Sequence, residues 1–262
     1  MAEELAPMKA QVYKDPRPKE YFDRFHERSR KRDPDPMYEV VRSVTTAVAY
    51  GFFRMRPIAA ELVPASGPVI LAPNHFSFFD HFFLAAALRR KVRFMAKSQM
   101  FKPPLQFIYD HGGVFPVRRG QRDDEAFITA KAILRRGGVV AMYCEGGRSR
   151  TGELSEQAKP GIGRLALESG AAIVPVAIHG SAKVRNWKKG QFPKVDILYG
   201  EPFRFEAVDE PTRDQQQLAA DQIFDEIKEL YARVGELGRK GVVRHWRLER
   251  RSRRRATSAV PS

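Results

Sequence analysis

The stretch "NHFSFFDHFF", residues 74–83, places Asn74, His75 and Asp80 among aromatic residues. An imidazole that donates to a carboxylate is held in one tautomer and can take a proton from a hydroxyl. Within one helix a five-residue spacing would point the two side chains apart, but a His in the preceding turn can meet an Asp in the first turn. Of the six histidines, only His75 has an acid five residues later. We therefore predict a His75–Asp80 pair that acts as a general base; the alternative is a capping His with a solvated Asp80.

The segments around this pair predict where it stands in the fold. Residues 67–74 form a short apolar run bounded by Gly and Pro, which is typical of a buried strand. Residues 77–88 have a helical pattern. His75 is thus expected at the carboxyl end of a strand, where open α/β sheets place their ligand sites.

Three further stretches could take part in the same site. Residues 112–119, "GGVFPVRR", form a short strand that ends in Arg118 and Arg119, and residues 144–154, "CEGGRSRTGEL", form a glycine-rich turn with Arg148. Guanidinium groups and accessible backbone N–H groups suit a phosphate. Pro175 lies inside the apolar run "IVPVAI", where it removes a ladder hydrogen bond, and this favours an edge strand or a bend that lines a cavity.

The order of these stretches resembles a known family. His-x4-Asp, Gly-x-x-Phe-x-x-Arg, Glu-Gly-x-Arg-Ser and Val-Pro follow one another between about residues 67 and 200. This pattern is similar to the four blocks of the glycerolipid acyltransferase family, typified by lysophosphatidic acid acyltransferase. The resemblance implies a catalytic dyad of His75 and Asp80, in which His75 deprotonates an acceptor hydroxyl that attacks an acyl thioester directly. No acyl-enzyme is expected.

The resemblance also implies substrate-binding residues. Arg118 and Lys97 correspond to phosphate-binding positions, Glu145 to the turn that binds the acceptor, and Pro175 to the acyl side of the pocket. The full predicted binding set is Asn74, Lys97, Phe115, Arg118, Glu145, Gly146, Arg148 and Pro175.

The third block departs from the family pattern Phe-Pro-Glu-Gly-Thr-Arg-Ser. Cys144 stands in place of the proline and Gly147 in place of the threonine, while Gln99 stands where the family often has an acid. A lost hydroxyl and a looser turn could reshape the acceptor pocket, so the pattern leaves the acceptor open. Cys144 could itself accept an acyl group. Its place at the end of an apolar strand favours a buried, inert thiol instead.

The whole chain predicts a single layered α/β domain. It has 262 residues, of which 43% are hydrophobic, and short β-branched runs alternate with helical stretches, which indicates a largely parallel sheet flanked by helices. The expected strands are 67–74, 92–97, 113–117, 138–144, 171–178 and 194–199, and the expected helices 37–55, 77–88, 123–136, 160–169 and 214–236. We predict a charged, poorly ordered arm at 1–36, an acyltransferase domain at 37–238 that includes the amphipathic helix 37–55, and a basic, disordered tail at 239–262.

Charge and composition point to an anionic partner. The formal net charge is +15, and about half of it comes from residues 239–255. This tail and the helix 37–55, whose apolar stripe could instead pack on the core, are expected at an anionic membrane surface. Nucleic acid is the less favoured partner, because no nucleic-acid motif accompanies the charge.

The remaining features of the sequence bear on the cellular compartment of the protein and on its need for a cofactor. A single cysteine excludes an internal disulfide and a multi-cysteine metal site. No secretion signal and no apolar run of about 20 residues are visible, so we expect a peripheral protein on the cytoplasmic face of the membrane. No metal and no cofactor is expected, apart from acyl-CoA or acyl carrier protein as the thioester co-substrate.

Together these features predict an O-acyltransferase that acylates a lysophospholipid, foremost 1-acylglycerol 3-phosphate giving phosphatidic acid. Glycerol 3-phosphate or another polar lipid is the alternative acceptor. A non-catalytic lipid-binding or nucleic-acid-binding module is the alternative from a different class.

Overall fold

A computed structural model describes residues 5–8, 14–119 and 123–258 of the chain. Its centre is one seven-stranded sheet with the strand order β1-β7-β6-β2-β5-β3-β4. All neighbouring strands are parallel except β6 and β7, which are antiparallel. The strands are β1 (Arg56–Ile58), β2 (Val69–Pro73), β3 (Val92–Lys97), β4 (Val114–Val117), β5 (Val139–Ala141), β6 (Ala172–His179) and β7 (Asp196–Tyr199). The predicted largely parallel α/β fold is confirmed.

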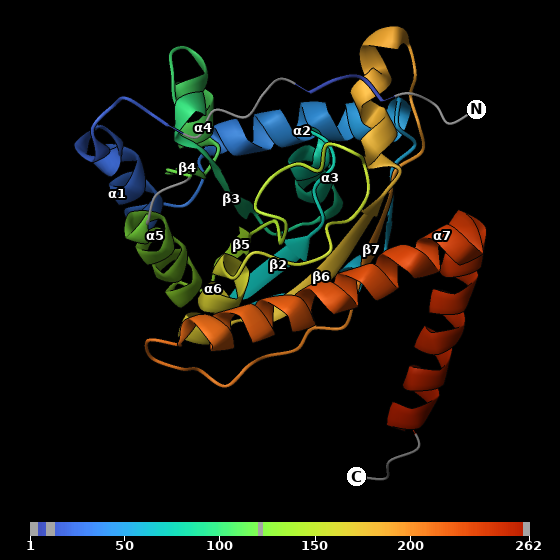
Figure 1. The fold of residues 1–262 in the computed structure, drawn as a ribbon. Helices are drawn as coiled ribbons and strands as arrows, with labels where there is room; N and C mark the ends of the chain where they lie inside the picture. Colours follow the sequence, from blue (N-terminus) through green and yellow to red (C-terminus); the bar gives the residue numbers. More distant parts are fainter. Residues whose placement is uncertain (1–4, 9–13, 120–122, 259–262) are drawn as a thin grey trace.

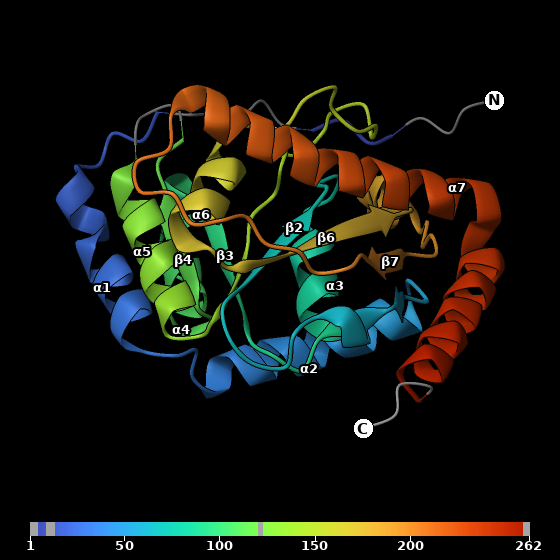
Figure 2. The same ribbon diagram turned by 90° about the horizontal axis from the view of Figure 1, so that it is seen from below.

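Helices cover both faces of the sheet (Figures 1 and 2). On one face lie α2 (Pro36–Gly51) and α3 (Asp80–Ala87); on the other lie α5 (Asp124–Arg135), α6 (Gly161–Ser169) and the first part of α7 (Arg213–Ser258). Within β2, Leu71 packs into the first layer and Ile70 into the second. Because both faces are covered, the central strands are continuous apolar runs rather than alternating ones.

The amino-terminal arm is more ordered than its composition predicts. Residues 1–4 and 9–13 lie outside the described part, but 14–36 form η1 (Lys19–Phe22), α1 (Asp23–Lys31) and their connections. Phe22 and Phe25 are 1% and 2% exposed and pack with Phe101 in a separate apolar cluster. Arg93 in β3, which is 3% exposed, donates to backbone carbonyls of the arm. The arm is therefore ordered by long-range contacts that its charged sequence does not reveal.

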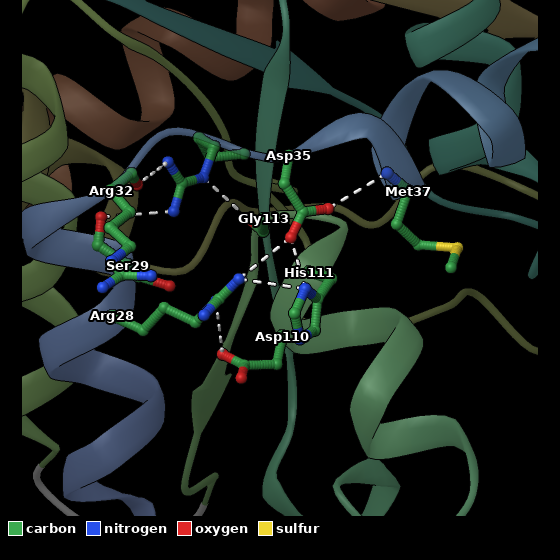
Figure 3. A network of polar contacts seen from close by, with 9 residues as sticks. Arg28, Ser29, Arg32, Asp35, Met37, Asp110, His111 and Gly113 are labelled. Carbon is green, nitrogen blue, oxygen red and sulfur yellow. Dashed lines mark hydrogen bonds and ion pairs between the residues drawn. The ribbon is translucent and has the colours of Figure 1, made fainter.

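A polar network joins the arm to the domain around Asp35 (Figure 3). One carboxylate oxygen of Asp35 accepts from the Met37 N–H at 3.0 Å and caps α2, while the other accepts from Arg28 at 2.9 Å. The imidazole of His111, the last residue of α4 (Leu105–His111), also contacts the second oxygen. Asp35 thus fixes α1, α2 and α4 relative to one another.

The carboxyl-terminal tail is also ordered, contrary to the prediction. The helix α7 breaks at Gly238, whose φ of 61° is left-handed, and continues to Ser258. After the break, Arg239 pairs with Asp196 at 2.5 Å, Val242 is 1% exposed, and Arg250 contacts Glu61 at 2.9 Å. These contacts hold the basic segment against the sheet edge, and 259–262 lie outside the described residues.

Pro175 does not lie on an edge strand, which corrects that part of the prediction. It is buried within β6, between β2 and β7. Its carbonyl accepts from the Gly200 N–H at 2.9 Å, directly after β7 ends at Tyr199. The proline nitrogen, which cannot donate a hydrogen bond, therefore lies where the neighbouring strand β7 ends. An interior strand can accommodate a proline at such a position.

None of the helices in the described ranges is long and apolar enough to cross a membrane.

Candidate active site

His75 follows the carboxyl end of β2, and Asp80 begins α3. Nδ1 of His75 lies 2.8 Å from Oδ2 of Asp80. The same oxygen accepts from the backbone N–H groups of Phe76 and Ser77, each at 2.8 Å. These two amides hold the Asp80 carboxylate at the amino end of α3, with one oxygen toward the imidazole. The structure thus brings together the two residues of the predicted dyad.

This contact determines which ring nitrogen of His75 is available. Because the Asp80 carboxylate accepts from Nδ1, that nitrogen carries the hydrogen, and the lone pair is on Nε2. Burial lowers the pKa of His75, and the hydrogen bond and charge of Asp80 partly oppose this shift. The imidazole is therefore neutral at pH 7 and can accept a proton there.

Tyr143 holds the imidazole from a second direction. Its ring stacks on that of His75, with centroids 3.8 Å apart and an interplanar angle of 16°. Asp80 bonds in the plane of the imidazole and Tyr143 covers one of its faces, so both tilt and rotation of the ring are restricted. The Tyr143 hydroxyl is buried without a hydrogen-bond partner among the described residues. Tyr143 was not among the predicted site residues, although it directly precedes Cys144 and follows β5, a strand beside β2.

A pocket of about 390 Å³ opens beside His75. Its cationic lining residues are Lys97, which is the last residue of β3, and Arg119 and Arg148, which follow β4 and β5. No carboxylate is among the described lining residues. The other lining residues are mostly apolar or aromatic: Phe78, His81, Phe94, Met95, Ala96, Met100, Tyr109, Val114 and Tyr143.

The three cations lie close enough to influence one another. Burial lowers the pKa of Lys97, and the charges of Arg119 and Arg148 lower it further. The same two arginines also act on His75. Three convergent cations next to a base, at adjoining carboxyl ends of parallel strands, form a site that suits a phosphate group.

The pocket lining differs from the prediction at one arginine. Arg119 lines the pocket, whereas Arg118 does not; the backbone N–H of Arg118 donates to Asp123 at 2.6 Å, before α5. Phe115 is 0% exposed and belongs to the core beneath α5 and α6, not to the pocket lining. Both arginines follow β4, and the structure places the second of them against the pocket.

Asn74 and Glu145 hold the loops of the site. The Asn74 side chain, 0% exposed, exchanges two hydrogen bonds with the backbone of Ile178, at 3.1 and 2.7 Å, and so extends the pairing of β2 with β6. Glu145, 8% exposed, accepts from the His75 N–H at 2.8 Å and from the Ser155 N–H at 3.1 Å. Burial raises the pKa of Glu145 to about 7, against these hydrogen bonds. Neither residue lines the pocket.

Gly146 and Pro175 also lie away from the pocket lining. Gly146 adopts a φ of 64°, and its N–H donates to the Tyr143 carbonyl at 3.1 Å, so it makes the turn that leads to Arg148. Of the predicted binding set, the structure therefore places Lys97 and Arg148 against the pocket.

Two further groups near the site differ in accessibility. His81 lines the pocket, and burial, together with the nearby His75, lowers its pKa to about 3, so it is neutral. Cys144 is 0% exposed, and burial raises the pKa of its thiol well above the usual range. A buried thiol of raised pKa is a poor nucleophile, which agrees with the inert role.

The described residues contain no group of three or more His, Cys, Asp or Glu side chains arranged to hold a metal ion.

Comparisons with known proteins indicate which proteins this chain is similar to. The family model described as "Acyltransferase" matches residues 55–179. The chain is 28% identical over 139 residues to the 1-acyl-sn-glycerol-3-phosphate acyltransferase LPAT1, chloroplastic, of Arabidopsis thaliana, which covers 52% of this chain and 38% of that protein. The chain thus spans well under half of the length of this relative.

The fold is similar to a solved structure as well. The crystal structure of the 1-acyl-sn-glycerophosphate (LPA) acyltransferase PlsC from Thermotoga maritima aligns with a TM-score of 0.55 and 20% identity, over 81% of this chain and 90% of that one. At this identity the likeness concerns the fold. The matched family model and the curated relative support the resemblance of this chain to the glycerolipid acyltransferase family.

Proposed function

We propose that this protein transfers a fatty acyl group from a thioester to the hydroxyl of 1-acylglycerol 3-phosphate, giving phosphatidic acid. The observation that carries the proposal is the pocket in which a neutral His75, paired with Asp80, adjoins Lys97, Arg119 and Arg148 and a mostly apolar lining. Both named relatives act on this class of acceptor according to their names.

The arrangement suggests the following chemistry. The phosphate of the acceptor binds among the three cations, and its hydroxyl donates to Nε2 of His75. The hydroxyl oxygen attacks the thioester carbonyl as His75 takes the proton. The tetrahedral intermediate then expels the thiolate, which recovers the proton from the imidazolium, and Asp80 stabilises that imidazolium while it exists. The neutral state of His75 at pH 7 makes this base competent.

The donor is proposed to be acyl-CoA or an acyl carrier protein, whose acyl chain lies along the apolar lining. Glycerol 3-phosphate, or another polar lipid, is the alternative acceptor because it would engage the same cations. We propose that the transfer needs no metal and no further cofactor, because a general base and cationic side chains suffice for this chemistry.

The surface supports a peripheral position on an anionic membrane, which we place at its cytoplasmic face. On α2, Val40 and Val44 are 57% and 62% exposed, as expected for an apolar face that contacts lipid rather than the core. Next to α2, α4 exposes Leu105 and Phe107. The carboxyl-terminal helix adds a row of exposed basic residues at helical spacing: Lys240, Arg244, Arg247 and Arg251. Such a row is attracted to anionic lipid.

The first test is thioester consumption by the purified protein with acyl-CoA or acyl carrier protein, with and without 1-acylglycerol 3-phosphate. We expect acceptor-dependent turnover in wild type and in His245→Ala, whose histidine is exposed and remote from the site, but not in His75→Ala. Turnover that does not need an acceptor would show a thioesterase instead. If neither thioester is consumed with any phosphorylated acceptor while the protein still binds anionic vesicles, the lipid-binding alternative holds.

A further inference from the structure

Arg185 joins the two loops that carry the site, although it lies outside the matched family region. It belongs to η4 (Ser181–Lys189), which follows β6. Its Nε donates to the Phe76 carbonyl at 2.8 Å and its Nη1 to the Arg150 carbonyl at 2.8 Å, while Nη2 donates to the Ser149 carbonyl. One guanidinium group therefore binds three backbone carbonyls from two loops.

Two of these three carbonyls, those of Phe76 and Ser149, belong to residues next to a residue of the site. Phe76 follows His75, and its own N–H donates to Asp80. Ser149 follows Arg148, and its N–H donates to the His75 carbonyl at 2.9 Å. The two loops thus meet directly at Ser149, and Arg185 spans the same junction from a third segment.

The segment that carries Arg185 is itself anchored. Val184, the preceding residue, is 0% exposed and packs in the core, and Trp187 packs edge-on against Phe79 at 5.9 Å between ring centroids. The Asn186 side chain accepts from the Ala6 N–H at 2.8 Å. A guanidinium group on such a support can hold the loops in place rather than follow them.

We infer that Arg185 is a positioning residue that sets the distance between the base His75 and the cation Arg148. The inference rests on the proposed function, in which one loop presents the base and the other binds the acceptor phosphate. An acceptor held by Arg148 reaches His75 only if both loops keep their separation, and a misplacement of about 1 Å can reduce a rate about 10²-fold. A lysine cannot replace Arg185, because one ammonium group lacks the planar fork that reaches three carbonyls.

The chain contains a matched control in Arg90. Its guanidinium group also donates to three backbone carbonyls, those of Pro64 at 2.8 Å, Gly67 at 2.7 Å and Gly137. Burial lowers the pKa of both Arg90 and Arg185. The carbonyls bound by Arg90, however, precede β2 and β5 at the opposite end of the sheet from His75.

The test compares Arg185→Ala, Arg185→Lys and Arg90→Ala by amide hydrogen exchange and by kinetics. In both Arg185 variants we expect at least a tenfold loss of protection at Ser149 and at Phe76, with no such loss in Arg90→Ala. In the kinetic assay we expect kcat to fall and KM for 1-acylglycerol 3-phosphate to rise, each about tenfold, in the Arg185 variants alone. Addition of ethylguanidinium to Arg185→Ala should restore part of the activity.

Two results would overturn the inference. One is unchanged protection of Ser149 and Phe76 in the Arg185 variants; the other is equal kinetic loss in Arg185→Lys and Arg90→Ala. If wild type shows no turnover with any acceptor, the proposed function fails, while the exchange data still decide whether Arg185 holds the loops. If Arg185→Ala does not fold, Arg185→Lys retains the charge and provides the same comparison.

Discussion

Replacement of Asp80 by Asn tests how much of the proposed catalysis depends on the paired carboxylate. The carboxylate is 0% exposed, and one of its oxygens accepts from Nδ1 of His75 and from two backbone amides. An asparagine oxygen in the same place can still accept these bonds. The substitution therefore preserves the shape of the site and removes mainly the negative charge.

The size of the effect follows from the intermediate state in which His75 carries the proton. A buried imidazolium without a counter-charge loses an attraction of about 4 kcal/mol, the value for unit charges about 4 Å apart at an effective dielectric constant of about 20. Because about 1.4 kcal/mol corresponds to a tenfold change in rate, we expect kcat to fall about 10³-fold. KM for the acceptor should change little, since Asp80 does not line the pocket.

The pH profile gives a second, independent readout. In wild type, burial lowers the pKa of His75, so the base stays neutral and active below its ordinary range. The Asp80 charge opposes this lowering, and its loss must lower the pKa of His75 further. The acid limb of kcat/KM should therefore move to lower pH in Asp80→Asn, while the plateau falls. General damage to the fold would not produce this shift.

The assay is initial-rate release of free thiol from acyl-CoA across pH 5–8, with 1-acylglycerol 3-phosphate as acceptor. Asp196→Asn is the matched control, because Asp196 is 6% exposed, is ion-paired with Arg239 and does not line the pocket. It should lower the thermal midpoint without a change in kcat. A loss below tenfold in a folded Asp80→Asn variant, or an acid limb that moves to higher pH, would refute the reasoning.

The remaining predictions concern the pocket and the surface. Arg119→Ala should raise KM for the phosphorylated acceptor about 10- to 100-fold, which corresponds to the loss of one charge-assisted hydrogen bond. Arg118→Ala should change this KM by no more than about threefold. Equal effects of the two substitutions would contradict the placement of Arg119, rather than Arg118, at the pocket. Tyr143→Leu should lower kcat about 2- to 10-fold through lost stacking, and Tyr143→Phe should match wild type, since the hydroxyl has no partner among the described residues. Val44→Asp should weaken partition to anionic vesicles about tenfold or more in a sedimentation assay, while Leu218→Asp, also exposed, should not.

The sequence predicts the sheet well because its strands are buried on both faces. The run 92–97 agrees with β3, the run 171–178 covers all of β6 except its last residue, and the other predicted strands each contain an observed one. The strand β1 was missed because Arg-Pro-Ile has too few apolar residues to stand out from a connection. The short helix α4 was missed for a similar reason, since it follows the pair Pro103-Pro104 and lacks a long apolar stripe.

At both ends of the chain, the amino-acid composition did not predict the helices that the structure contains. Segments rich in charge and proline were expected to lack order, yet their few apolar residues, such as Phe25 and Val242, are buried against distant parts of the chain. Their charged groups also find specific partners, as Arg239 does with Asp196. Order of this kind depends on tertiary contacts, which local composition does not encode.

At the site, the sequence identifies the right turns but not the task of each residue within them. Residues near the tips of the turns, such as His75 and Arg148, face the pocket, whereas Asn74 and Glu145, at the strand ends, bind backbone groups of neighbouring loops. A strand end must still satisfy the backbone groups that leave the ladder, and a buried polar side chain does this most directly. Polar residues of one turn are thus divided between holding the loop and binding the ligand. Arg185, which follows a different strand, performs the first task for two turns at once, and only the folded chain shows it.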